Sequence, residues 1–406
     1  MPTIKNKSIY ESTLLCSLLF LVFVKPEALV HGNEGLGRLY TYTEFFFTLI
    51  LIIALFFRGR MDKVVIWLIL FFGIPLLVTM MRGGSMYDYC RGQFPSLGLC
   101  LVFILWMERA PITLLSASRV LQLYIYINFY TVITYPEGLY LAEDSIDVYC
   151  WFLNGKNEQV RQIMPIVALS MMYSYQTKNR LSKSDYILIA ISYATLIMVN
   201  SSTAIVGMTL FIVLCFIPNK FFTPLVKKLN LVTLFVAVAL IGSACLYLSF
   251  QENFAFLIED ILHKEMDFTG RLPIWEVAIE GIEKEPIWGY GYMTLDDYAH
   301  YIGMAHNHPH NQVLFLLLRG GILLLIVELV GLWHSSRSLQ HVKGVFASKS
   351  LFAVLACFIL MGMTESHVNC VMLYPLYIMA MMAENLVAAN TLPQETHIRH
   401  ITLNYR

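Results

Sequence analysis

Long apolar runs separated by short polar segments fill most of the chain. An apolar helix of about 20 residues crosses a hydrocarbon layer about 30 Å thick, and most of these runs approach that length. The pattern predicts an all-α, polytopic bundle of about twelve transmembrane helices, with one large loop that contains an amphipathic helix. The predicted spans are 8–24, 39–57, 64–81, 92–107, 120–135, 160–176, 185–200, 203–218, 231–250, 311–333, 350–364 and 370–388.

Two parts of the pattern leave the number of spans open. The apolar part of 160–176 is short, and the polar residues 200–202 lie either within one long run or at the turn of a tight hairpin. An odd number of spans would place the two termini on opposite sides of the membrane. The distribution of charge therefore has to decide between the alternatives.

Basic residues favour twelve spans and one orientation. With the amino terminus inside, the inner segments carry 18 of the 28 lysines and arginines, the outer segments carry 9, and Arg319 lies within a span. This asymmetry follows the positive-inside rule. The expected organisation is spans one to nine in 1–250, a large extracytoplasmic loop with the candidate catalytic motifs in 251–310, and spans ten to twelve with a cytoplasmic tail in 311–406.

Composition excludes several classes of protein. The 406 residues are 57% hydrophobic and 14% charged, against roughly a quarter charged in soluble domains. A soluble enzyme, a disordered scaffold and a collagen-like or repeat protein are therefore excluded. A net charge of zero gives no reason to expect a nucleic-acid partner. The eight cysteines show no metal-binding spacing, which is typical of apolar packing residues.

The loop 251–310 contains eleven of the 28 acidic residues. Within it, residues 272–284 place apolar side chains on one helical face and glutamates on the other. Two interpretations stay open: this helix lies on the membrane surface with Trp275 facing lipid or the bundle, or it packs only against neighbouring spans. The aromatic turn 289–292 suits a bulky polar ligand, but it is equally typical of any tight turn.

Four of the eleven histidines lie between residues 300 and 310, just before the tenth predicted span. Pro309 suits the first turn of a helix, which would place His310 and Asn311 at the outer end of that span. A helix amino terminus disfavours imidazolium and so favours a neutral ring that can accept a proton. The pattern predicts a general base or a substrate-orienting histidine here.

Two alternatives remain for the histidine cluster. His306, His308 and His310 would form a metal site, although they are crowded into five residues around a proline and no companion HxxxH pair exists. The second alternative is a cluster with only a structural or surface role.

Basic side chains near the outer surface are candidates for binding an anion. Arg271 is a natural clamp for a diphosphate, because a guanidinium matches the geometry of phosphate oxygens. Arg161 and Lys156 would complete such a site. The alternative for Lys156 is that its long side chain only extends to the membrane interface.

Arg319, Glu44 and Glu328 are charged residues inside predicted spans, where charge is costly. Arg319 and Glu44 are expected to face the bundle interior or a wet cavity. We expect a structural ion pair, either between these two residues or between Arg319 and Glu328, with a role in lining the substrate cavity as the alternative.

Three motifs in this region resemble those of a known family. They are 270–275 (Gly-Arg-Leu-Pro-Ile-Trp), 286–291 (Pro-Ile-Trp-Gly-Tyr-Gly), and His310-Asn311 followed by an apolar helix with Gly321. Their order and spacing over about 270–325 resemble the O-antigen ligase and polymerase superfamily, bacterial inner-membrane glycosyltransferases that act on undecaprenyl-diphosphate-linked glycans. The resemblance implies a catalytic His310 and a diphosphate-binding Arg271, with no metal, nucleotide sugar or other cofactor.

The chain departs from the family pattern at two places. Many relatives have a Ser-Arg pair in a span near the middle of the chain, whereas residues 200–204 contain no arginine. That anion contact is expected to be absent or to have moved to Arg161. The second departure is Arg319, which stands two positions before the helix glycine where relatives often have an acidic residue.

The resemblance implies a reaction on the extracytoplasmic side of the bacterial cytoplasmic membrane. The donor is an undecaprenyl-diphosphate-linked oligosaccharide, with its diphosphate near Arg271 and Arg161 and with His310 as the base. The remaining expected substrate-binding residues are Lys156, Tyr290, Asn311, His308, Asp296 and Asp297. The lipid bilayer is the expected surroundings, and a flippase and a chain-length regulator are expected partners.

Three other functions compete with polymerisation of repeat units. An O-antigen ligase would use the same donor with lipid A-core as the acceptor, and a protein-directed oligosaccharyltransferase would use a protein. We favour a polymerase because the segments beginning at Lys25-Pro26 and spanning 152–157 look like those of surface-polysaccharide polymerases. The alternative from another class is a flippase, which twelve spans would fit but for which the chain shows no repeated halves.

Overall fold

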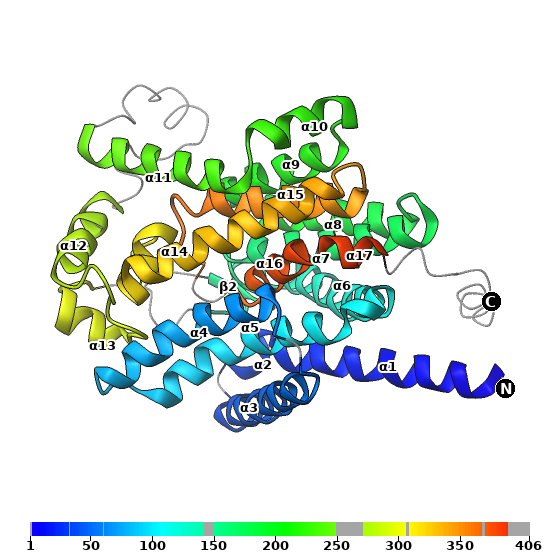
Figure 1. Cartoon of the computed structure of the whole chain (residues 1–406), viewed down its shortest axis with the longest axis horizontal. Coiled ribbons are helices and arrows are strands. Elements are labelled where there is room, and N and C mark those ends of the chain that lie inside the picture. The colour runs from blue at the N-terminus through cyan, green and yellow to red at the C-terminus, as the bar shows by residue number, and fades with distance from the viewer. Residues whose placement is uncertain are drawn as a thin grey trace.

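The computed structural model describes residues 2–31, 33–59, 61–141, 149–248, 271–305, 308–367 and 370–388 (Figure 1). Helices dominate this part of the chain, and α12 and α13 lie at one end of the bundle while α1 begins at the opposite end. The elements are α1 (Pro2–Phe23), α2 (Glu27–Val30), α3 (Glu34–Phe57), α4 (Lys63–Met81), α5 (Met86–Trp106), η1 (Met107–Arg109), α6 (Ala110–Thr134), β1 (Tyr140–Leu141), β2 (Tyr149–Trp151), β3 (Asn154–Gly155), α7 (Gln159–Lys178), α8 (Lys183–Met198), α9 (Ser202–Phe216), α10 (Asn219–Lys228), α11 (Leu231–Leu248), α12 (Arg271–Lys284), α13 (Leu295–Asp297), η4 (Tyr298–Ile302), α14 (Gln312–His341), α15 (Phe346–Met361), α16 (Leu373–Met381) and α17 (Ala383–Ala388).

Each of the twelve predicted spans coincides with a helix, and the last one is divided at Met382 into α16 and α17. Among the described residues, four helical stretches are long and apolar enough to cross a membrane: α3, α4, the stretch Met86–Thr134, and α14. The pair α9 and α10, bent by 114°, would make a fifth. The chain is thus a helical, multi-pass membrane protein, and the count of twelve spans stays a prediction.

The polar residues 200–202 form a tight turn. Helix α8 ends at Met198, Asn200 adopts a left-handed conformation with φ +53°, and α9 begins at Ser202. Of the two alternatives for this segment, the hairpin is therefore correct. Helix α10, which follows α9, was not predicted, because its ten residues include Pro224 and the apolar run before it had already ended.

Helices α7 and α15 lie in the centre of the bundle. Nearly every side chain of α15 is buried, and α7 is buried along most of its length. In contrast, α3 exposes much of its apolar surface, as expected for a helix that faces lipid; Phe56 and Phe57 are each more than 80% exposed. The most enclosed helices therefore carry or lead into the residues of the candidate site described below.

The all-α prediction is confirmed, and the described residues add one small antiparallel sheet in the order β1-β2-β3. It lies in the segment between α6 and α7, and the buried side chain of Asn128 on α6 anchors it. The Asn128 Oδ1 accepts a hydrogen bond from the Leu153 amide at 2.9 Å, and its Nδ2 donates to Gln159 Oε1 at 2.9 Å. Asn128 thereby fixes the start of α7.

We expect Asn128→Ala to destabilise the protein by about 1–3 kcal/mol, because a buried amide and a buried carbonyl lose their partners. The measurement is the apparent melting temperature of the purified protein in detergent. Thr134→Ala is the control, since its hydroxyl bonds only to the Tyr130 carbonyl one turn back in an exposed part of the same helix. Equal melting temperatures for the two variants would contradict the anchoring role.

Helix α14 is kinked at two glycines. Gly320 has φ −147° and ψ 15°, and Gly321 has φ +61° and ψ −160°, a conformation open only to glycine. The kink frees the carbonyls of Leu318 and Arg319, which accept hydrogen bonds from the amides of Tyr290 at 2.6 Å and Gly291 at 3.0 Å. The turn that follows α12 is therefore docked into α14.

The contact between this turn and α14 leaves no room for side chains. The Ile322 amide donates to the Pro286 carbonyl at 2.9 Å. A Cβ on Gly321 would lie 2.1 Å from the Ile287 carbonyl oxygen, and one on Gly289 would lie 2.5 Å from the Leu318 carbonyl oxygen. Gly289 and Gly321, which belong to two separate sequence motifs, thus lie against each other. We call this contact the glycine joint.

Helix α12 turns its apolar face to the bundle. Trp275, Ala278 and Gly281 are buried and the helix packs on α14 and η4, while the three glutamates of the opposite face are exposed. The predicted faces are confirmed. Trp275 faces the bundle, as both interpretations allow, and the position of the helix on the membrane surface stays a prediction.

The predicted ion pairs of Arg319 are wrong. Its guanidinium lies over the rings of Tyr292 at 5.1 Å and Phe315 at 5.3 Å, while the Glu328 carboxylate accepts a hydrogen bond from the Tyr377 hydroxyl at 2.6 Å. The kink at Gly320 and Gly321 lies between Arg319 and Glu328, and the described contacts of the two side chains are with different partners. Glu44 on α3 is buried and forms no described ion pair with Arg319.

Candidate functional site

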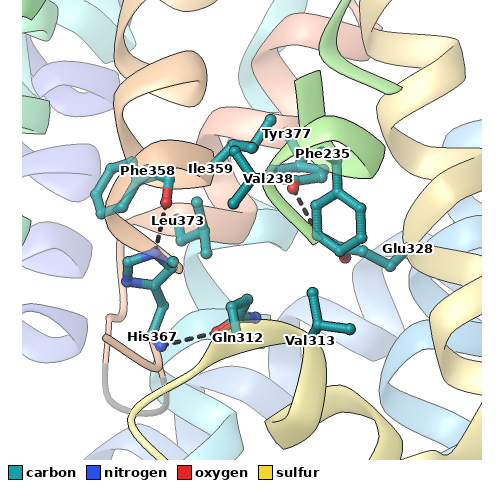
Figure 2. A pocket seen from close by; sticks show the side chains of 11 residues that line it. Phe235, Val238, Gln312, Val313, Glu328, Phe358, Ile359, His367, Leu373 and Tyr377 are labelled. Carbon is teal, nitrogen blue, oxygen red and sulfur yellow. Dashed lines mark hydrogen bonds between the residues drawn. The ribbon is translucent and has the colours of Figure 1, made fainter. Parts of the chain in front are cut away.

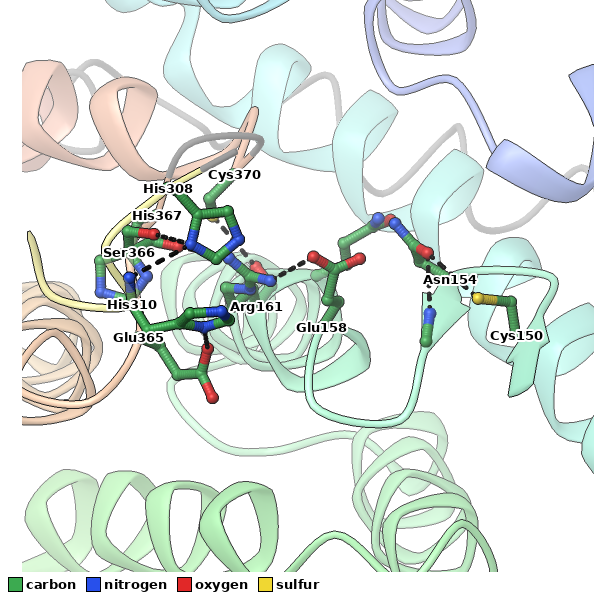
Figure 3. Close-up of polar contacts among 12 residues, drawn as sticks. Cys150, Asn154, Glu158, Arg161, His308, His310, Glu365, Ser366, His367 and Cys370 are labelled. Atoms are coloured by element: carbon green, nitrogen blue, oxygen red, sulfur yellow. Dashed lines mark hydrogen bonds and ion pairs between the residues drawn. The ribbon is translucent and has the colours of Figure 1, made fainter. Parts of the chain in front are cut away.

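Four segments that are far apart in the sequence converge at one place, and Figure 3 shows the three that carry Arg161, His310 and Glu365. They are the first turn of α7 with Arg161, the start of α12 with Arg271, the residues before α14 with His310, and the segment between α15 and α16 with Glu365. Each segment stands at the end of a helix or beside one, so the backbone of the bundle fixes its position.

The Glu365 carboxylate is the centre of this cluster. Its Oε1 lies 2.7 Å from Nη2 of Arg271, and its Oε2 lies 3.7 Å from Nδ1 of His310. The side chain is 8% exposed. Burial raises the pKa of this carboxyl, but the neighbouring His310 and the charges of Arg271 and Arg161 outweigh burial and bring the pKa to about 2.

The sign of this shift fixes its effect on stability. Because the pKa of Glu365 lies below its ordinary value of 4.5, the carboxylate stabilises the fold fully above pH 4.5. That contribution is lost as the pH falls toward 2. The cluster therefore contains an internal negative charge at neutral pH.

Arg161 binds the other side of the same segment. Its Nη1 donates to the Ser366 carbonyl at 2.7 Å, and its Nη2 pairs with the Glu158 carboxylate at 2.5 Å. The residue is buried although it carries a charge. These contacts hold the backbone directly after Glu365 in a fixed position.

His308 and His310 lie side by side in front of α14. Their ring centroids are 4.1 Å apart, and the Nδ1 of His308 is 2.7 Å from the Ser366 hydroxyl and 3.3 Å from the His310 amide. His310 has a left-handed backbone with φ +49°, which turns the chain into the helix. The third histidine of the predicted metal site, His306, lies outside the described residues.

Helix α14 begins later than the proline predicted. Asn311 is its N-cap, since the Asn311 Oδ1 accepts hydrogen bonds from the amides of Val313 at 3.0 Å and Leu314 at 3.2 Å. Pro309 therefore precedes the helix instead of lying in its first turn. The Asn311 Nδ2 also donates to the Met363 carbonyl at 3.0 Å, which ties the start of α14 to the end of α15.

His367 points away from the cluster into the bundle. Its amide donates to Gln312 Oε1 at 2.8 Å, and its Nε2 donates to the Phe358 carbonyl at 2.8 Å. Burial, aided by the charge of Arg161, lowers the pKa of His367 to about 4, so its ring is neutral at pH 7. Figure 2 shows the small cavity beside it, which has a volume of about 20 Å³ and extends to Glu328 and Tyr377. A cavity of that size holds about one water molecule and no sugar.

A second cavity, of about 80 Å³, adjoins the cluster. Trp275 and Ile279 of α12, Val313 of α14 and Val238 of α11 supply most of its apolar wall, and Asn311 and Met363 stand at the boundary with the cluster. An apolar space therefore lies directly beside the charged groups.

The structure brings together four of the predicted site residues: Arg271, His310, Arg161 and His308. Asn311 lies next to them as the helix cap. The other four have different surroundings. Tyr290 donates from its hydroxyl to the Gly281 carbonyl at 2.9 Å, Asp297 caps α13 with Thr294, and Asp296 and Lys156 are exposed. The roles of all nine residues stay predictions.

Sequence reasoning missed Glu365 and Ser366. Their only signal was that polar residues fill the short gap between the last two predicted spans, which any turn between two helices shows. Nothing in the spacing linked this turn to Arg271 or His310.

Residues 187–329 match the family model described as O-antigen ligase. This segment of the chain is similar to the O-antigen ligase family. The matched segment runs from α8 to the middle of α14 and includes Arg271 and His310, and it confirms the resemblance to the ligase and polymerase superfamily. Comparisons with curated proteins and with solved structures give no match.

The similarity to this family has a consequence for function. Proteins of the O-antigen ligase family are glycan-transferring enzymes, so the family supports a ligase-type or polymerase-type reaction. It gives no support to the alternative of a flippase. Arg161 and Glu365 lie outside the matched segment. Folding of the chain places them near Arg271 and His310, which lie inside it.

Proposed function

We propose that the protein is a metal-independent glycosyltransferase that polymerises undecaprenyl-diphosphate-linked repeat units on the outer face of the bacterial cytoplasmic membrane. The observation that carries this proposal is the convergence of His310, Arg271 and Arg161 around one buried anion, Glu365. A site in which a guanidinium pairs with a buried carboxylate is suited to a phosphate, because both anions present paired oxygens to arginine.

The donor would bind with its diphosphate at Arg271 and near Arg161. Positive charge at that position stabilises the diphosphate as it leaves, which is the role that a metal ion has in other transferases. The apolar cavity beside Trp275 would take the first part of the lipid chain. This arrangement would keep the sugar end of the donor toward His310.

His310 would act as the general base. As the acceptor hydroxyl oxygen forms its bond to the anomeric carbon, the bond from that carbon to the diphosphate oxygen breaks. The hydroxyl proton passes to His310, and undecaprenyl diphosphate is the leaving group. A single displacement inverts the configuration at the anomeric carbon.

An O-antigen ligase is the second candidate, because the matching family model bears that description. A ligase would use the same donor site and the same base. Only the acceptor differs: lipid A-core for the ligase, and another lipid-linked repeat unit for the polymerase.

The test is reconstitution of the purified full chain in liposomes that contain undecaprenyl-diphosphate-linked repeat units. We expect a ladder of lipid-linked chains without lipid A-core, at an unchanged rate when EDTA is present. Glycan found only on added lipid A-core would establish a ligase instead. Loss of activity in EDTA would contradict metal independence, and movement of units across the bilayer without a new glycosidic bond would identify a transporter.

A further inference from the structure

One carboxylate fills the space between the basic groups of the candidate site. Glu365 contacts both Arg271 and His310, the two groups on which the proposed reaction depends. A carboxylate on an arginine occupies the place that phosphate oxygens would need, because guanidinium binds both through the same pairs of N–H groups. A donor diphosphate and Glu365 therefore compete for Arg271.

The two oxygens of Glu365 have separate partners. Oε1 is within close hydrogen-bond distance of Arg271 at 2.7 Å, whereas Oε2 is 3.7 Å from His310, beyond the 2.7–3.2 Å of a good hydrogen bond. The carboxylate thus pairs closely with Arg271 and more loosely with His310. Release from Arg271 would allow it to close on the histidine.

Hydrogen bonds hold the main chain on both sides of Glu365. The Glu365 amide donates to the Met361 carbonyl at 2.9 Å, Arg161 binds the Ser366 carbonyl, and the His367 amide donates to Gln312. These contacts fix the main chain on both sides of the residue. A change of partner at Glu365 therefore requires only a rotation of its side chain.

We propose that Glu365 is a positioning residue that closes the anion site in the substrate-free enzyme and moves from Arg271 to His310 when a diphosphate binds. The inference rests on the proposed function. In its second position Glu365 accepts a hydrogen bond from Nδ1–H of His310, which holds the ring with Nε2 toward the acceptor hydroxyl. Binding of the donor thereby orients the base.

Inorganic pyrophosphate is the probe, because it carries the diphosphate without lipid or sugar. Calorimetry on the purified full chain in detergent would compare the wild type with Glu365→Gln, which loses both the charge that competes for Arg271 and the charged acceptor that would hold His310. We expect the variant to bind pyrophosphate about ten- to a hundredfold more tightly. In the liposome assay its KM for the donor should fall while its kcat falls about tenfold or more, whereas a purely structural role would weaken binding and rate together.

Two further variants complete the experiment. Glu276→Gln is the control: it removes one carboxylate from the exposed face of α12, opposite the face that packs on the bundle, so pyrophosphate affinity and kcat should stay at the wild-type values. Glu365→Asp keeps the charge one methylene farther from Arg271 and should give intermediate affinity and an intermediate kcat. It also supplies the test by itself if the glutamine variant aggregates.

The outcomes separate this inference from the proposed function. Pyrophosphate affinity equal to that of the wild type in both Glu365 variants overturns the inference, even where the wild type polymerises glycan. A wild-type protein that forms no glycan, together with a Glu365→Gln variant that binds pyrophosphate more tightly, overturns the proposed function and supports the closed anion site.

Discussion

Replacing His310 by glutamine should lower the rate of glycan elongation by about 10²- to 10⁴-fold, the range that a general base contributes. Glutamine fills a similar space and still forms hydrogen bonds, but it cannot take a proton from the acceptor hydroxyl at neutral pH. The measurement is the chain length of glycan on the lipid carrier and on the cell surface, with the amount of protein in the membrane checked for each variant. We expect single lipid-linked units to remain on the outer face.

The matched control is His300→Gln. His300 belongs to the same histidine-rich segment but is exposed, and its ring contacts Tyr301. This variant should produce chains of normal length. Normal chains from His310→Gln would exclude His310 as the base, and repeat units trapped on the inner face would point to transport.

The second large effect concerns folding. Gly321→Ala should destabilise the protein by more than about 3 kcal/mol, because a backbone with φ +61° and ψ −160° is open only to glycine and the new Cβ would lie 2.1 Å from the Ile287 carbonyl oxygen. The joint between α14 and the turn after α12 would have to open. We expect a lower yield of monodisperse protein, a lower melting temperature in detergent and the loss of elongation.

Gly344→Ala is the control for this experiment. Gly344 has no atom within 4 Å of the position of a Cβ and no left-handed backbone, so its variant should melt like the wild type. If Gly321→Ala kept the wild-type melting temperature, the joint would not be rigid. The docking of the glycine turn would then not be what places Arg271 near His310.

The helices could be predicted from the sequence because hydrophobic runs determine them locally. The same pattern gave no warning of the break at Met382 or of the short strands, since neither changes the average hydrophobicity of a segment. It also misplaced the start of α14. There the hydrogen bonds from the Asn311 side chain to Val313 and Leu314 decided the boundary, against the preference of Pro309 for a first turn.

The candidate site could be predicted only in part. Arg271 and His310 were found through motifs whose order resembles a family, not through any rule of spacing, because 39 positions and a loop separate them. Glu365 is a polar residue in a turn between two apolar helices, and such turns are usually polar. Its role depends on contacts made by three other segments, which only the folded chain reveals.

The glycine joint has a mechanical consequence. Because the turn 286–291 is locked into the kink of α14, helix α12 and the first half of α14 behave as one rigid body that carries Arg271 at one corner and His310 at another. Glu365 stands on a separate segment, between α15 and α16. Because Asn311 and Gln312 at the start of α14 also bond to that segment, the backbone that carries the carboxylate keeps its place relative to both basic groups, and a change of partner falls to the Glu365 side chain alone.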